Sequence, residues 1–316
     1  SDYAYSIAKY LNTRHHTKRI SSSNLLETVD KLPHIYDEPF SDSSQIPTYL
    51  VSEFASNDVK VVLTGDGADE VFGGYNRHVL VDQYWQKFRS LPTFMKRISA
   101  TMGSSLSEKN WDYINNIVNR AIPSYKIEML GNKIYKALNF IESKDDIDLY
   151  ESLVFIERDT QSVLIESSEY DFFENYYGII PDYLDASQKI MHLDQMISLS
   201  SQILVKVDRA TMANSLESRI PFLNHDVVEF AASLPLDYMV DNGIGKKILR
   251  EILFERVPRE LFQRPKRGFG VPIDEWLRHD LRSWSEDLIS EKKIIQQENF
   301  NYKYIERIWR EHQSGK

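Results

Sequence analysis

A run of β-branched and aliphatic residues at positions 59–63 places the strongest constraint on how this chain folds. The run ends in Thr64 and Gly65, and a short apolar run bounded by a glycine is typical of a buried strand in a parallel sheet. Ligands of open α/β sheets bind at the carboxyl ends of the strands. The run therefore predicts an α/β domain with a ligand site directly after this strand.

The segment that follows the strand is GDGADEVFGGY, which is rich in glycine and in carboxylates. Gly65 and Gly67 would let backbone amides approach a ligand closely. Asp66 or Asp69 could hold Mg²⁺ on a polyphosphate, because Mg²⁺ prefers hard oxygen ligands and shares them with phosphates. A turn with solvated acids explains the same residues equally well, so the spacing alone leaves both interpretations open.

Three later segments carry further candidates. Glu217 and Arg219 flank an expected break, where side chains can point into a cleft, although an ion pair that fixes a helix end is the simpler explanation. Lys246 follows a glycine at the first turn of an expected helix, where it could meet a phosphate or belong to a solvated basic patch. Lys266 and Arg267 lie in a glycine-rich loop that could close over an anion or be a plain surface loop.

The remainder of the chain is expected to be mostly helical, because apolar residues recur at helical spacing over most of it. A second strand is expected at residues 13–21. Helices are expected over 2–11, 24–35, 45–57, a segment through Tyr84 and Phe88, 107–165, 187–233 with a break at Pro221, 246–254, and two last segments that carry Trp276, Trp284 and Trp309.

The composition excludes several classes of protein. With 38 basic and 47 acidic side chains the formal net charge is −9, so the chain lacks the broad basic face that nucleic acid requires. No apolar run approaches the ~20 residues of a membrane span. The absence of cysteine excludes disulfides, thiolate metal sites and cysteine nucleophiles within the chain, and a cytoplasmic location is expected.

Five segments, taken together, resemble the C-terminal synthetase domain of glutamine-dependent asparagine synthetases of the asparagine synthetase B type. They are DEPFSDSSQIPTYL, VVLTGDGADEVFGGY, SLESRIPFL, GKKILR and KRGFGVPIDEWL, in the family's order and spread over most of residues 1–280. The resemblance implies a parallel sheet of the adenine-nucleotide alpha-hydrolase type, as in PP-loop ATP pyrophosphatases, with extensive surrounding helices. It implies a nucleotide-binding α/β part over residues 1–80 and a mostly helical part over residues 81–316 that completes the site.

The resemblance also implies a reaction in two steps. ATP adenylates a substrate carboxylate and releases pyrophosphate, and ammonia from a glutaminase domain then attacks the acyl-adenylate. Lys246 would stabilise charge on the leaving pyrophosphate, and Asp66 could deprotonate the incoming amine. By resemblance, the nucleotide would be contacted by Thr64, Gly65 and Gly67, Mg²⁺ would be bound by Asp69, and the site would be completed by Glu217, Arg219, Lys266 and Arg267.

Three features of the family are missing from this sequence. It contains no Ser-Gly-Gly-x-Asp-Ser-Ser loop to grip pyrophosphate and no N-terminal cysteine to hydrolyse glutamine, and it ends before the family's last helices. The first residues, which do not begin with Met, are expected to be the edge of a longer chain cut just after that loop. The chain alone is expected to make no amide. A strand left without its neighbours would favour self-association, for example as a homodimer.

The first expectation for the acceptor carboxylate is aspartate. Residues 42–46, however, replace the Thr/Arg-containing stretch of aspartate-specific members, and Asn224 stands where Asp often follows Pro-Phe-Leu. Relatives with such a segment resemble amidotransferases that act on a uronic-acid sugar in surface polysaccharide biosynthesis, which is the alternative. A β-lactam synthetase-like enzyme and a catalytically inactive interaction domain are further alternatives.

Overall fold

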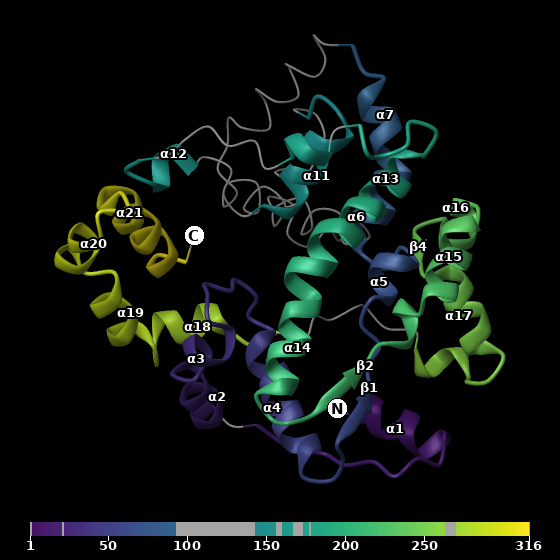
Figure 1. Cartoon of the computed structure of the whole chain (residues 1–316), viewed down its shortest axis with the longest axis horizontal. Coiled ribbons are helices and arrows are strands. Elements are labelled where there is room, and N and C mark those ends of the chain that lie inside the picture. Colours follow the sequence, from purple (N-terminus) through teal and green to yellow (C-terminus); the bar gives the residue numbers. More distant parts are fainter. Residues whose placement is uncertain are drawn as a thin grey trace, which may run out of the picture. The chain divides into compact units, whose positions relative to one another are not determined.

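The computed structural model describes residues 2–20, 22–92, 143–155, 160–166, 173–176, 178–262 and 270–315, which are mostly helical with two small sheets (Figure 1). Two compact units are formed, each from two stretches of chain. Unit 1 consists of Ser1–Val79 and Met191–Ile273, and unit 2 of Leu80–Ile190 and Asp274–Lys316. None of the described helices is long and apolar enough to cross a membrane.

Strand β1, Val61–Leu63, lies within the run predicted from the sequence and pairs in parallel with β2, Glu217–Arg219. The predicted strand and its parallel pairing are confirmed, but the predicted burial is wrong. Residues Val61 and Leu63 are 51% and 76% exposed. Among the described residues β1 has one neighbouring strand, so little covers it. The arrangement is a helix-rich α/β fold with a small parallel sheet.

The sequence misses one strand and predicts another that does not form. It predicts a break between helices near Pro221, which the structure has, but it does not predict that β2 forms in this break by pairing with β1, which is distant in the chain. The sequence also predicts a strand over 13–21, whereas residues 13–20 have no regular secondary structure. Every side chain of that stretch is exposed, so no half-buried face stabilises a strand there.

The helices of unit 1 agree with the helical spacing of the sequence, and the one predicted over 24–35 is divided in two. The long stretch from η3 to α14 begins as π-helix, and α14 packs against α4. The elements of this unit are α1 Asp2–Tyr10, α2 Ser22–Val29, α3 Leu32–Tyr36, α4 Gln45–Ser56, α5 Ala68–Val71, α6 Asn76–Leu80, η3 Asp194–Ile203, α14 Leu204–Met212, η4 Pro221–Leu223, α15 His225–Ser233, α16 Leu236–Met239, β3 Val240–Asp241, β4 Ile244–Gly245, α17 Lys247–Phe254 and η5 Arg259–Leu261.

Two clusters of buried side chains fix the segment that follows β1. Val71 and Phe72 pack with Ala231 of α15, and partly buried side chains of α15 and α17 complete this cluster. The second cluster joins Met191 to Met239. Because burial of each large apolar side chain contributes about 1.5–3 kcal/mol, the first cluster holds the end of the acidic segment against α15 and α17.

Unit 2 is helical in its described residues. Helix α11 begins with a capping side chain, since Asp145 accepts hydrogen bonds from the N–H groups of Ile147 and Asp148. Where the sequence predicts two helices at the end of the chain, the structure has four, α18 to α21. Glu298, with a left-handed φ of 56°, ends one of them. The predicted helix over 107–165 falls partly outside the described residues. The elements are η1 Val81–Trp85, α7 Gln86–Arg89, α11 Asp146–Val154, α12 Thr160–Val163, η2 Glu174–Tyr176, α13 Ala186–Leu193, α18 Ile273–Arg278, α19 Arg282–Leu288, α20 Glu291–Gln297 and α21 Tyr302–Gln313.

Candidate functional site

The acidic loop, residues 64–70, begins where β1 ends. The N–H of Thr64 donates to the carbonyl oxygen of Arg219 at 2.9 Å, so the loop leaves the sheet beside the end of β2. Gly67 has a φ of +79°, and a Cβ there would lie 2.6 Å from a methyl group of Leu223, so this turn requires glycine. Oγ1 of Thr64 is buried and has no hydrogen-bond partner among the described residues. Such a hydroxyl has bonding capacity left for a ligand.

Asp69 and Lys246, two candidates far apart in sequence, meet in the structure. Nζ of Lys246 lies 3.1 Å from Oδ1 of Asp69, and the side chains of the lysine and the aspartate are 27% and 29% exposed. The pair lies over Gly74, where a Cβ would overlap both the carboxylate and the lysine side chain. Gly245 lies similarly close to the backbone of Gly73. Glycine at these positions therefore lets the two segments approach and brings the ammonium group to the acidic loop.

The backbone of Lys246 holds its side chain in place. Its N–H donates to the carbonyl oxygen of Phe72 at 3.2 Å, and its φ of 54° lies in the left-handed region. A residue other than glycine rarely adopts this conformation, and such residues are concentrated at functional sites. Lys246 directly precedes α17, so it lies at the start of a helix as the sequence predicts.

The acidic loop offers part of a metal site rather than a complete one. No group of three or more His, Cys, Asp or Glu side chains that could hold a metal occurs in the part of the chain that the structure describes. Mg²⁺ commonly takes one or two protein carboxylates and completes its shell with phosphate oxygens and water. Asp69, partly exposed beside a lysine, fits that pattern, and Asp66 is partly exposed on the preceding turn.

The other predicted site residues are not all brought together. Glu217 and Arg219 lie two residues apart on β2, so their side chains share one face of the sheet. They form an ion pair with each other and are 47% and 64% exposed. The sequence also allows an ion pair here, although at a helix end rather than on a strand. Lys266 and Arg267 lie outside the described residues.

A buried network behind the acidic loop is missed by the sequence interpretation. Glu70 is 1% exposed and accepts a hydrogen bond from the hydroxyl of Tyr75. Burial raises the pKa of Glu70, although the bond from Tyr75 opposes this. Asp194, at the start of η3, is fully buried and binds Arg77 and His78. Asp194 is the one carboxylate between Lys189 and Lys206 in this helical stretch, and its isolation is the sequence signal that could have identified it.

The protonation of the buried pair follows from its surroundings. Burial lowers the pKa of His78, so its imidazole is neutral near pH 7 and donates from Nε2. Burial alone would raise the pKa of Asp194, but the hydrogen bonds from His78 and Arg77 outweigh burial and lower it. Asp194 is therefore an ionised carboxylate in the interior, and its charge is balanced by Arg77.

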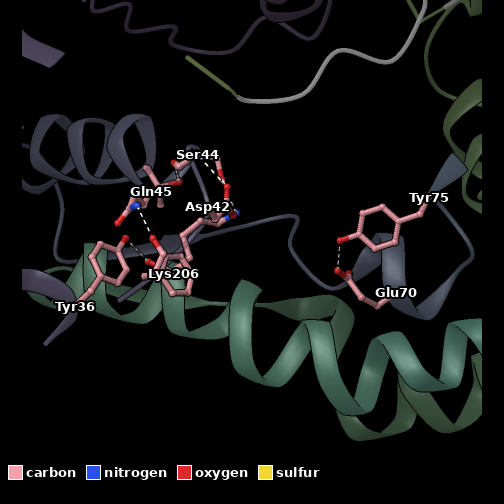
Figure 2. Close-up of polar contacts among 9 residues, drawn as sticks. Tyr36, Asp42, Ser44, Gln45, Glu70, Tyr75 and Lys206 are labelled. Carbon is pink, nitrogen blue, oxygen red and sulfur yellow. Dashed lines mark hydrogen bonds and ion pairs between the residues drawn. The ribbon is translucent and has the colours of Figure 1, made fainter. Parts of the chain in front are cut away.

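The segment that the sequence links to the acceptor, residues 42–46, forms a polar cluster with Lys206 of α14 (Figure 2). Nζ of Lys206 lies 3.1 Å from the Asp42 carboxylate and 2.9 Å from Oγ of Ser44. Ser44 donates to Asp42 from its N–H and its hydroxyl, at 2.8 and 2.7 Å. Burial alone would raise the pKa of Asp42, but these bonds and the charge of Lys206 lower it. Asp42 thus neutralises Lys206.

Comparison with known proteins adds to this geometry. A family model described as asparagine synthase matches residues 1–316. The glutamine-hydrolyzing asparagine synthetase 1 of Bacillus subtilis strain 168 is 30% identical over 302 residues, which cover 92% of this chain and 43% of that protein. A putative glutamine-hydrolyzing asparagine synthetase of Mycobacterium bovis is 31% identical over 287 residues, 90% of this chain and 41% of that protein. The chain spans less than half the length of these two relatives.

Proposed function

The chain belongs to the asparagine synthase family, and from this premise we propose that it is the synthetase part of an ATP-dependent amide-forming enzyme. In the proposed reaction a carboxylate oxygen of the acceptor attacks the α-phosphorus of ATP, and pyrophosphate leaves. Ammonia then attacks the acyl carbon, loses a proton to a base, and AMP leaves. Because the relatives are named as glutamine-hydrolyzing, we propose that a glutaminase domain supplies the ammonia.

The observation that carries this proposal is the contact between Asp69 and Lys246 over Gly74, close to the carboxyl end of β1. A partly exposed ion pair contributes only about 0–1 kcal/mol to stability. Stability alone is thus a weak reason for glycine beneath the pair. Polyphosphate with bound Mg²⁺ presents both negative oxygens and a cation, so it requires adjacent groups of opposite charge. The pair supplies both.

The proposal gives each candidate residue a role. The buried hydroxyl of Thr64 would form a hydrogen bond with the nucleotide. The next residue, Gly65, has no side chain to obstruct the approach of the nucleotide. Asp66 would accept a proton from the incoming amine. The pair β1–β2 would belong to a larger parallel sheet of the PP-loop type. The nucleotide would be contacted by Thr64, Gly65 and Gly67, Mg²⁺ by Asp69 together with phosphate oxygens, and the leaving pyrophosphate by Lys246, while Glu217, Arg219, Lys266 and Arg267 would shape the site.

We propose aspartate as the first acceptor and a uronic acid as the second. One observation favours the second candidate: the cation beside residues 42–46, Lys206, is already neutralised by Asp42. The ammonium group of Lys206 is therefore already paired and is not a free positive charge for an α-carboxylate. An α-carboxylate prefers a bidentate cation such as arginine, whereas a sugar is bonded well by neutral polar groups.

Pyrophosphate release by the whole protein tests this function. The assay would contain ATP, Mg²⁺, and either glutamine or an ammonium salt, with aspartate, glutamate, free uronic acids and nucleotide-linked uronic acids offered separately. We expect release that depends on one acid and yields its amide. Activity with ammonium but not with glutamine would contradict the glutaminase partner. Absence of release with every acid, from folded protein, would favour the inactive interaction domain.

A homodimer is part of the same proposal, since β1 exposes apolar side chains. Light scattering of the whole protein would determine the number of copies, and a strictly monomeric protein at high concentration would contradict it.

A further inference from the structure

A network of buried side chains lies behind the acidic loop, among residues with no proposed contact to ATP. It starts at Asp194, the first residue of the π-helical segment η3. Nε and Nη2 of Arg77 donate to the two carboxylate oxygens at 2.8 and 2.6 Å, and Nε2 of His78 lies 2.6 Å from one of them. Two parallel bonds fix the orientation of a guanidinium as well as its position. Asp194 therefore holds Arg77 in a single geometry.

The second link joins Arg77 to the acidic loop. Cζ of Arg77 lies 3.9 Å from the centre of the Tyr75 ring, and the ring of His78 meets the same ring edge-on with centroids 5.4 Å apart. Figure 2 shows the hydroxyl of Tyr75 pointing at the carboxylate of Glu70, to which it donates a hydrogen bond. Tyr75 is thus held by the two residues that Asp194 holds.

The residue after Asp194 makes a third link. Nε2 of Gln195 donates to the backbone carbonyl oxygen of Glu70 at 3.1 Å. Two successive residues of η3 are therefore linked to Glu70. Asp194 is linked to the side chain of Glu70 through Tyr75, and Gln195 bonds directly to the main chain of Glu70. π-helical segments are rare and often occur at functional sites, and here the segment directs both residues to one turn.

Glu70 is the sequence neighbour of Asp69 in the four-residue helix α5. The carbonyl oxygen of Asp69 accepts a hydrogen bond from the N–H of Gly74 at 2.7 Å, so the same turn also places Gly74 beneath the Asp69–Lys246 pair. A shift of Glu70 would move Asp69 relative to Lys246.

We propose that Asp194 is a positioning residue: it fixes the turn that carries Asp69 opposite Lys246. It acts through Arg77 and Tyr75 and does not touch ATP or the acceptor. The effect on reaction rate rests on the proposed function, whereas the effect on the loop does not.

The test compares Asp194→Asn with Asp146→Asn in the whole protein. Asp146 is a matched control, because it is 9% exposed and accepts hydrogen bonds from Trp85 and Lys189 at 2.7 and 3.1 Å, all within unit 2. The first measurement is hydrogen–deuterium exchange over residues 66–75, where the N–H groups of Val71 and Gly74 are bonded. We expect Asp194→Asn to speed exchange there by about tenfold or more, and Asp146→Asn to leave it unchanged.

The second measurement is ATP–pyrophosphate exchange, resolved into kcat and KM. Because a misplacement of about 1 Å can cost about 100-fold in rate, we expect Asp194→Asn to lower kcat by tenfold to 100-fold with little change in the KM for ATP. Asp146→Asn should alter neither. Tyr75→Phe removes only the hydroxyl that links the network to Glu70, so it should act in the same direction and keeps the test valid if Asp194→Asn does not fold.

Three outcomes decide the matter. Faster hydrogen exchange over residues 66–75 together with a lower kcat, in either Asp194→Asn or Tyr75→Phe, supports the proposal. Unchanged hydrogen exchange in both variants, or an equal loss of kcat in Asp146→Asn, overturns it. If the unsubstituted protein shows no ATP–pyrophosphate exchange, the proposed function fails, and hydrogen exchange still decides whether Asp194 positions the loop.

Discussion

Asp194 and Asp146 are buried aspartates of two different units, and they have similar partners and different surroundings. Each binds a basic side chain, and each is linked to a π-helical segment: Asp194 begins η3, whereas Trp85, which donates to Asp146, ends η1. The bonds of Asp194 lead to the acidic loop through Tyr75. Those of Asp146 join Trp85 to Lys189, and both of these partners belong to the packing of unit 2.

This difference shows that the role of a buried ion pair depends on the groups that its members contact in turn. Breaking either pair should cost stability, because a charge left in the interior is expensive. The Asp194 network bonds to Glu70, in the turn beside the Asp69–Lys246 pair. Substitutions at the two aspartates therefore separate a loss of stability from a loss of function.

The largest effect is expected on stability when each carboxylate is removed entirely. Asp194→Ala takes away the carboxylate shared by Arg77 and His78, whose side chains are 21% and 0% exposed, and should cost about 3–5 kcal/mol. Asp146→Ala should cost less, about 1–3 kcal/mol, because the side chain of Asp146 is itself 12% exposed, whereas that of Asp194 is 0% exposed. Urea denaturation followed by tryptophan fluorescence measures both, and equal losses would remove the distinction between the two clusters.

The next effect concerns the rate of adenylation. Lys246→Ala should lower it by about 10²–10³, with a smaller change in ATP affinity, if the lysine stabilises charge that develops on the leaving pyrophosphate. Lys247→Ala is the matched control, because Nζ of the neighbouring Lys247 forms an ion pair with Asp241 at 2.9 Å. A collapse of ATP binding with a normal rate at saturation would instead assign Lys246 to ground-state binding.

Glycine substitutions examine the same site with a smaller expected effect. Gly74→Ala places a methyl group against Asp69 and Lys246. It should lower the free energy of unfolding by about 1–3 kcal/mol, and it should also lower activity. Gly65→Ala meets nothing within 4 Å, so stability should change by less than about 0.5 kcal/mol. Nucleotide affinity should nevertheless fall for Gly65→Ala if the nucleotide approaches this backbone closely. Isothermal titration with ATP and thermal unfolding separate the two effects, and unchanged affinity would move the nucleotide away from Gly65.

The smallest effect is a pH dependence of stability. Burial lowers the pKa of His78 from its ordinary 6.5, so the unfolded chain binds this proton at a higher pH than the folded chain does. Stability is therefore lost as the pH falls below about 6.5 toward the folded pKa, with a slope of at most about 1.4 kcal/mol per pH unit. Asp194, whose pKa is lowered, stays ionised in this window.

The variant His78→Gln should lose that slope, whereas His225→Gln should keep it, since the side chain of His225 is 83% exposed. Urea midpoints at pH 5 and pH 7.5 report the difference. Parallel pH dependences in both variants and the unsubstituted protein would show that His78 does not carry it.

Local sequence patterns predict the strand β1, the acidic loop after it and the helix after Lys246, because each depends on a few consecutive residues. The exposure of β1 and the existence of β2 depend on long-range pairing, which no local pattern reveals. Lys246 is a candidate from its own segment, but its contact with Asp69 depends on glycines in two distant segments that allow close approach.

The Asp194 network is the part of the site that sequence reasoning misses altogether. Asp194, Arg77 and His78 look like ordinary residues of η3 and α6, and only the fold places Asp194 within reach of Arg77 and His78. Burial of these side chains, rather than their residue types, determines which groups their charges pair with, because a buried carboxylate requires partners whereas an exposed one does not.

ATP–pyrophosphate exchange dependent on an added carboxylic acid, in the whole protein and its Asp69→Asn and Asp146→Asn variants, tests the central claim most directly. The loss of one ligand charge weakens Mg²⁺ binding, so Asp69→Asn should abolish exchange while the thermal midpoint changes little. Asp146→Asn should retain exchange despite its structural cost. Near-normal exchange in Asp69→Asn, or a comparable loss in Asp146→Asn, would contradict the assignment of the acidic loop as the ATP site.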